Sequence, residues 1–227
     1  VKFENSDISL NDASGTDIAA TDLKLIANET SGDVEVINQV DISGTIAEIL
    51  DINNSNVTFT KADISLNDAS GTGVKASDLA TISQLSTATI DVISSIDVSG
   101  SLSDMVTAVT NGLIFSTLTD VSLNDASGTV VDGDDLKTLV DVSGLNIEAI
   151  NELKIKKGSL AAMLAITTSV SDINIVTSDV SLNDASNSII LASDLVTAGK
   201  EYDDVEVIFN VDISGTVKQI LDAINED

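Results

Sequence analysis

The sequence predicts an α/β repeat protein, an elongated right-handed solenoid of parallel β-strands and short helices with about four units of 56–59 residues. The first observation is that the string "SLNDAS" occurs four times, and its copies start 56, 57 and 59 residues apart. Self-similarity at a nearly fixed period is the signature of a repeat architecture. We expect the repeats to cover residues 1–56, 57–114, 115–174 and 175–227 and to form one continuous solenoid.

A second shared string supports the same division of the chain. It reads "VDISGTIAEIL" from Val40, "IDVSGSLSDMV" from Ile96 and "VDISGTVKQIL" from Val211, and it is degraded to "KIKKGSLAAML" from Lys154 in the third repeat. Each copy contains a glycine at the same place: Gly44, Gly100, Gly158 and Gly215. Each repeat therefore has two conserved corners.

The second repeat shows the expected order of elements. Residues 57–66 alternate between apolar and polar side chains, which predicts a strand. Residues 67–72, "NDASGT", are turn formers, and a short helix capped by Ser77 should follow them. Residues 88–100 predict a second strand, and Ser101 should cap a second short helix. Each repeat is thus expected to run strand, turn, helix, strand, helix.

Stacking of the repeats is expected because helices this short need tertiary packing, and a repeat with so few aromatic residues makes a poor core alone. Strands joined by helical crossovers pair in parallel with right-handed connections. The leucine of each "SLNDAS" copy should point into the core: Leu10, Leu66, Leu123 and Leu182. A second file of large apolar residues should stack beside it: Phe3, Phe59, Phe115 and Ile175.

The composition excludes several functions. The chain has 37 acidic residues against 10 lysines, a net charge of −27, and no Cys, His, Arg, Pro or Trp. This charge disfavours binding to nucleic acids and to anionic membrane surfaces. The lack of His removes the usual general base and the commonest transition-metal ligand. There is no apolar run long enough for a transmembrane helix, and the chain starts in repeat register without a signal peptide, which indicates a mature product or an excised segment.

The aspartates of the repeated string are candidate calcium ligands. Stacking would bring Asp12, Asp68, Asp125 and Asp184 to one corner, with Asp7, Asp63, Asp120 and Asp179 in a second file nearby. Calcium takes six to eight oxygen ligands, but no EF-hand loop and no glycine-rich nonapeptide of the β-roll type is present. The alternative is that these residues form turns and helix caps. The densest cluster is Asp132, Asp134 and Asp135, which is the best candidate for a single cation site.

Three lysines distinguish the third repeat. The three residues are Lys154, Lys156 and Lys157. In the other repeats, the same positions fall on the triplet Asp-Ile-Ser or Asp-Val-Ser and on the residue just before it. They form either a solvated edge or a docking point for an acidic surface, such as a neighbouring copy of this chain. Contacts of the second kind, made head to tail, build open filaments when the rotation does not close.

The alternation of "DISLNDAS" and "ASDL" with "VDISGT" resembles repeats of very large secreted or cell-surface proteins of marine bacteria, described as calcium-binding, haemolysin-like or adhesin-like. The resemblance covers all four repeats. It implies an extracellular, non-enzymatic structural role and stabilisation by calcium. The haemolysin-type nonapeptide is missing from this sequence, which weakens the implied calcium binding.

We therefore expect a structural extracellular repeat protein, a segment or subunit of a surface filament, surface layer or adhesin, that associates end to end. The alternative is a calcium-binding module stabilised or switched by stacked aspartates. A catalytic role is not expected, because one active site does not need four near-equal scaffolds. Carboxylate pairs of the glycosidase type leave a carbohydrate-active solenoid enzyme as a third alternative.

Overall fold

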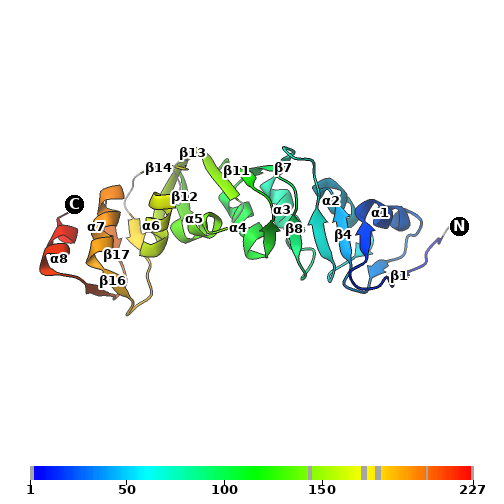
Figure 1. The fold of residues 1–227 in the computed structure, drawn as a ribbon, viewed down its shortest axis with the longest axis horizontal. Coiled ribbons are helices and arrows are strands. Elements are labelled where there is room, and N and C mark those ends of the chain that lie inside the picture. Colours follow the sequence, from blue (N-terminus) through cyan, green and yellow to red (C-terminus); the bar gives the residue numbers. More distant parts are fainter. Residues whose placement is uncertain (1–2, 143–144, 170–172, 177–179, 203, 226–227) are drawn as a thin grey trace. The chain divides into compact units, whose positions relative to one another are not determined.

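The computed structural model describes residues 3–142, 145–169, 173–176, 180–202 and 204–225. It confirms an α/β fold with several parallel sheets and eight short helices among these residues, and none of the described sheets closes into a barrel (Figure 1). The chain divides into two compact units. One comprises Val1–Val121 with Gly144–Asn146, and the other comprises Ser122–Ser143 with Ile147–Asp227.

The first unit contains four helices: α1 (Ala20–Asn28), α2 (Ile46–Asn53), α3 (Ala76–Ile82) and α4 (Leu102–Thr110). Its strands are β1 (Ile8–Leu10), β2 (Asp17–Ala19), β3 (Val34–Val36), β4 (Asp41–Gly44), β5 (Val57–Thr58), β6 (Asp63–Leu66), β7 (Gly73–Lys75), β8 (Ile90–Val92), β9 (Asp97–Gly100) and β10 (Leu113–Phe115). Two further strands, β11 (Thr119–Leu123) and β13 (Leu145–Gly158), contribute residues to both units.

Strand pairing in the first unit is parallel and in register with the repeated sequence. One sheet has the order β1-β3-β5, another has the order β10-β8-β6-β4-β2, and β7 pairs with β9. The pairing of β4 with β6 sets Ile42 opposite Ile64 and Ser43 opposite Ser65, so the same triplet, Asp-Ile-Ser, lies on both strands. Because the same residues lie opposite each other on the two strands, their side chains can pack in the same way.

The second unit repeats this arrangement. Its helices are α5 (Gly133–Val140), α6 (Leu160–Ser169), α7 (Ala192–Glu201) and α8 (Val217–Ile224). Its remaining strands are β12 (Thr129–Asp132), β14 (Ile173–Val176), β15 (Val180–Leu182), β16 (Ile189–Leu191), β17 (Val205–Val207) and β18 (Asp212–Ser214). Strand β13 pairs with β12, β14 and β15, strand β15 pairs with β17, and strand β16 pairs with β18, all in parallel.

Successive helices lie side by side in each unit, α1 to α4 in the first and α5 to α8 in the second (Figure 1). None of the described helices is long and apolar enough to cross a lipid bilayer. The helices bury the apolar residues that helical spacing puts on one stripe, such as Ile46, Ile49 and Ile52 of α2. The core of each unit therefore lies between its helices and the strands.

The expected core files are confirmed except at the N-terminal edge of the described residues. Leu66, Leu123 and Leu182 are buried, whereas Leu10 is half-buried. Phe59 and Phe115 are 4% and 5% exposed, whereas Phe3 is 44% exposed. The position of the Ile175 side chain lies outside the described residues. Burial in these files depends on a neighbouring segment on each side.

Two details of the expected element order are wrong. Residues 57–66 and 88–100 each form two short strands instead of one, because the chain turns a corner between β5 and β6 and between β8 and β9. Helix α3 begins at Ala76, with Lys75 as its N-cap, so Ser77 lies inside the first turn and is not the cap. The cap at Ser101 is confirmed, since its side chain accepts a hydrogen bond from the Asp104 amide.

Candidate functional site

The repeated string ends in the same tight turn in all four copies. The amide of the residue six positions after the leucine donates to the carbonyl of the alanine: Thr16 to Ala13, Thr72 to Ala69, Thr129 to Ala126 and Ser188 to Ala185, at 2.9–3.0 Å. The third residue of each turn has a positive φ, between 68° and 78°: Gly15, Gly71, Gly128 and Asn187. Such a turn takes Gly or Asn at this position, so the fourth copy tolerates its Asn.

The aspartate of the string caps a helix that lies earlier in the chain. The Asp68 carboxylate, only 7% exposed, accepts a hydrogen bond of 3.0 Å from the amide of Ile46, the first residue of α2. In the second unit, the Asp184 carboxylate accepts one of 2.9 Å from the amide of Leu160, the first residue of α6. These amides have no partner within their own helix, and the positive end of the helix dipole favours a carboxylate.

The other two copies make further contacts. Asp125 is half-buried, and its carbonyl accepts a hydrogen bond of 2.8 Å from the Asn151 side chain. Asp12 is exposed, and its carboxylate accepts no hydrogen bond from any residue that the structure describes, although its carbonyl accepts one from Asn38. The structure therefore does not gather the four aspartates into one site, because each serves its own corner.

The second file of aspartates joins neighbouring strands. Carboxylate oxygens accept hydrogen bonds from groups 26 residues later in the chain: Asp7 from the Asp33 amide at 3.0 Å, Asp63 from the Thr89 amide at 2.9 Å, and Asp120 from the Asn146 side chain at 2.8 Å. Asp179 lies outside the described residues. The first file thus carries hydrogen bonds between predicted repeats, and the second file carries hydrogen bonds between strands of one predicted repeat. The turn and cap alternative in the sequence specified neither partner.

In the cluster of Asp132, Asp134 and Asp135, two of the carboxylates accept hydrogen bonds from donors of the same unit. The Asp132 side chain accepts a hydrogen bond from the Asp134 amide, as the N-cap of α5, and forms an ion pair of 2.9 Å with Lys157. The Asp134 carboxylate accepts bonds from the amide and hydroxyl of Ser159 and from the side chain of Asn183. Two of the three candidate ligands thus already have hydrogen-bonding partners.

The ionisation of this cluster follows from these contacts. Burial alone would raise the pKa of Asp134, but the hydrogen bonds from Ser159 and Asn183, with Lys157 nearby, lower it below its ordinary value. Burial raises the pKa of Asp135, and repulsion from Asp132 adds to this. The hydrogen bond and charge of Asp132 raise the pKa of Lys157. The cluster is a local ion-pair network at the start of α5.

The three lysines of the third repeat lie along β13 with different exposures. Lys154 is half-buried, whereas Lys156 and Lys157 are exposed. Lys157 pairs with Asp132 within the unit, so it is not a free cation that waits for an acidic partner. Of the two exposed lysines, Lys156 is the one for which no ion pair is described, and its role as a docking residue stays a prediction.

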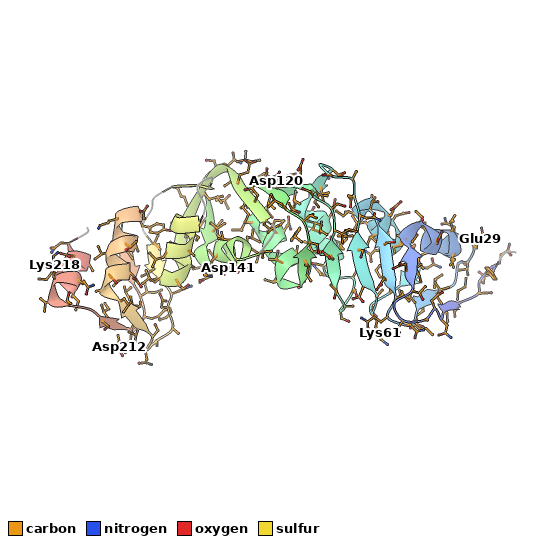
Figure 2. All side chains as sticks on the ribbon, viewed as in Figure 1. Glu29, Lys61, Asp120, Asp141, Asp212 and Lys218 are labelled. Atoms are coloured by element: carbon orange, nitrogen blue, oxygen red, sulfur yellow. The ribbon has the colours of Figure 1, made fainter. Side chains whose placement is uncertain are left out.

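Within the part of the chain that the structure describes, no three acidic side chains are grouped closely enough to hold a metal ion. The acidic residues spread over the surface instead, and the labelled Glu29, Asp120, Asp141 and Asp212 in Figure 2 are all exposed. Calcium binding therefore stays a prediction.

Sequence reasoning missed one feature of the corners. A Cβ atom on Gly44 would lie 2.8 Å from the Cβ atom of Ala20, the first residue of α1, and one on Gly215 would lie 2.8 Å from that of Ala192 in α7. Real Cβ atoms essentially never approach so closely. The recurring glycine of the second string is thus required by its neighbour, and the alanine that begins the first helix in three of the four repeats was the available signal. Comparisons with protein families, with curated proteins and with solved structures find no match for this chain.

Proposed function

We propose that this chain is a structural, non-enzymatic repeat protein of the cell surface or extracellular space, a segment or subunit of a filament, surface layer or adhesin. Its repeats form one continuous right-handed solenoid. The observation that carries the proposal is the cap from Asp68 to the Ile46 amide and from Asp184 to the Leu160 amide. In these two copies the recurring aspartate joins neighbouring segments, and this is the need of a scaffold that extends by repetition.

The charge distribution supports this role. A surface with a net charge of −27 stays soluble and repels nucleic acid and anionic membranes, so binding is expected through the ends of the solenoid and not through a charged face. The extracellular location is supported by the likeness of the repeats to those of secreted surface proteins of marine bacteria.

Small-angle X-ray scattering of the chain at a concentration where it is monomeric tests the proposal. A compact protein of 227 residues has a radius of gyration of about 17 Å, and a continuous solenoid must exceed this clearly. A radius near the compact value would contradict the solenoid. Turnover of any polysaccharide would contradict the non-enzymatic role.

The same sample distinguishes the calcium-binding module. Melting curves with calcium and with chelator should coincide if the aspartates act only as caps and strand joints. A large rise of the melting temperature in calcium would mean that the folded chain binds the ion, since a ligand that binds only the native state stabilises it by mass action.

A further inference from the structure

The last described helix, α8, has the same local structure as α2, but no further segment among the described residues covers it. Both helices begin with a capping box, on Thr45 in α2 and on Thr216 in α8. The first residue of α2, Ile46, is 4% exposed, whereas its counterpart in α8, Val217, is 76% exposed. The α2 amide at this position is capped by Asp68, and among the described residues no aspartate caps the amide of Val217.

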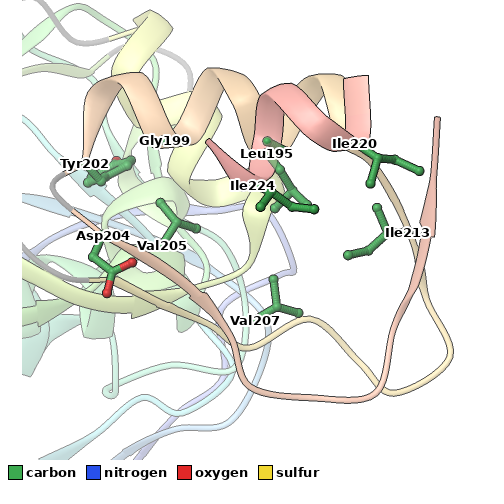
Figure 3. A pocket seen from close by; sticks show the side chains of 10 residues that line it. Leu195, Gly199, Tyr202, Asp204, Val205, Val207, Ile213, Ile220 and Ile224 are labelled. Atoms are coloured by element: carbon green, nitrogen blue, oxygen red, sulfur yellow. The ribbon is translucent and has the colours of Figure 1, made fainter. Parts of the chain in front are cut away.

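The strand before α8 is uncovered in the same way. Strand β4 pairs with β2 and with β6, but β18 pairs only with β16 among the described strands. Ile42 of β4 is fully buried, and its counterpart Ile213 in β18 is 47% exposed. Between α7 and α8 lies an apolar groove of about 260 Å³, whose walls include Leu195, Val207 and Ile220 (Figure 3).

The N-terminal edge has the complementary features. Strand β6 pairs with β4 and β8, but its counterpart β1 pairs only with β3 among the described strands. Phe3 is 44% exposed while its counterpart Phe59 is 4% exposed. Asp12 carries the carboxylate that corresponds to Asp68, and this carboxylate has no donor among the described residues. The C-terminal face lacks a strand partner, an apolar cover and a carboxylate cap, and the N-terminal face exposes one of each.

We propose that a second copy of this chain docks its N-terminal face on this C-terminal face and reproduces the contact of β4 and α2 with β6. Strand β1 of the second copy then pairs with β18 in parallel, with its Ile8 opposite Ile213. The Asp12 carboxylate of that copy accepts a hydrogen bond from the amide of Val217. The inference rests on the proposed structural function and specifies the joint.

The occupant is a copy of this chain because the two faces have the sequences of an existing interface. Residues 7–14 and 63–70 are both "DISLNDAS", and residues 212–214 and 41–43 are both "DIS". In the existing interface, β5 packs against α1 and α2, and Phe59 follows it directly. By the same geometry, Phe3 of the second copy fills the groove between α7 and α8.

Three physical terms favour this joint. It removes exposed apolar surface at Phe3, Ile213 and Val217 from water. It pairs two open strand edges, which otherwise present unpaired backbone groups to any partner. It also puts a carboxylate at the positive end of α8. Because the contact joins different faces of two copies, it is heterologous and produces rings or open filaments.

Cysteine crosslinking tests the register directly, because the chain has no cysteine of its own. An Ile8→Cys chain is mixed with a tagged Ile213→Cys chain under mild oxidation, and a mixed disulfide dimer is expected. Ser9→Cys replaces Ile8→Cys in the matched control, since this side chain points to the opposite face of the strand. Crosslinking of the Ser9→Cys chain as efficient as that of the Ile8→Cys chain would overturn the proposed register.

Sedimentation over a range of concentrations measures the association itself. Asp12→Ala should weaken it about tenfold, which corresponds to about 1.4 kcal/mol. Val217→Asp should abolish it. Ile150→Asp, at a residue of β13 that is 60% exposed, should leave it unchanged. Circular dichroism verifies that each variant folds.

A chain that stays monomeric at every concentration and gives no mixed disulfide overturns the joint. If such a monomer still has the large radius of gyration of a solenoid, the proposed structural function stands without the joint. If its radius is that of a compact protein, both fail.

Discussion

Removal of the Asp68 carboxylate is the most direct test of the idea that the repeated string joins segments. In the Asp68→Ala variant the amide of Ile46 loses its acceptor, and this residue is only 4% exposed, so water cannot readily replace the bond. The variant leaves the strand β6 and the turn after it unchanged, because their hydrogen bonds use backbone atoms. The effect therefore reports the cap alone.

The expected size follows from the contact. A buried donor left unsatisfied costs about 1–3 kcal/mol. Loss of a carboxylate from a helix N-terminus costs about 0.3–1 kcal/mol more. Together these contributions make about 1.3–4 kcal/mol for Asp68→Ala. Asp68→Asn keeps an oxygen acceptor and loses only the charge, so it should cost about 1 kcal/mol or less.

Urea unfolding followed by far-UV circular dichroism measures this loss, and the midpoint should fall by about 1 M. The single tyrosine, Tyr202, lies in the second unit, so its fluorescence should report a transition that the substitution leaves in place. At a concentration where the chain is monomeric, the matched control is Asp12→Ala, the same residue of the same string without a helix of its own chain to cap, which should change stability by less than about 0.5 kcal/mol. The reasoning is refuted if both variants lose the same stability, or if neither does.

Three further predictions follow from the corners and the buried groups. Gly44→Ala should cost about 1–3 kcal/mol of stability because its new Cβ atom would meet Ala20. The control Gly73→Ala should cost almost nothing, since its Cβ atom meets open space. Urea unfolding compares the two variants, and Ala20→Gly should partly rescue Gly44→Ala. Burial raises the pKa of Tyr202 to about 12, so the unfolded chain ionises first, and stability is lost as the pH rises from about 10 towards 12; Tyr202→Phe should flatten this decline in unfolding measured by circular dichroism. Burial also raises the pKa of Asp135, so its charge destabilises the fold at neutral pH; Asp135→Asn should raise the melting temperature at pH 7, and this gain should shrink as the pH falls through that pKa.

The sequence predicted the α/β class, the parallel pairing and two helices in each predicted repeat, because these depend on the period and on local alternation. It did not predict that residues 88–100 form two strands, since both β8 and β9 have the same alternating pattern and the corner between them has no Gly or Pro. It also placed the cap of α3 at Ser77, because Ser is a common N-cap, while the structure continues β7 directly into the helix at Ala76.

The site was predicted only in part for a physical reason. The sequence indicates that Asp68 recurs at a turn, but the donor that it binds, the Ile46 amide, lies 22 residues earlier and is contributed by another segment. A backbone amide has no residue signature, so no pattern of side chains could reveal this partner. A residue that caps a distant helix and one that binds calcium share the same requirement, an oxygen acceptor at a fixed corner, and the sequence alone does not separate them.

The third repeat shows that these joints constrain one another. In the first repeat, Ala19 lies opposite Ser43 on the paired strands, just before Ala20 and Gly44. In the third repeat the corresponding pair is Asp132 opposite Lys157, which form an ion pair.

The change extends to the next position of the same pair of strands. Gly133 stands where the other repeats have alanine, and a Cβ atom on Gly158 would lie 3.0 Å from the sulfur of Met163 and 3.2 Å from the Cα atom of Gly133. In the third repeat, glycine therefore replaces the alanine because the sulfur of Met163 occupies the space of the alanine side chain. Both partners change at the first of these positions, and at the second the alanine is replaced while Gly158 stays, as expected if the contact between segments, and not the chemistry of any one residue, is what the repeat preserves.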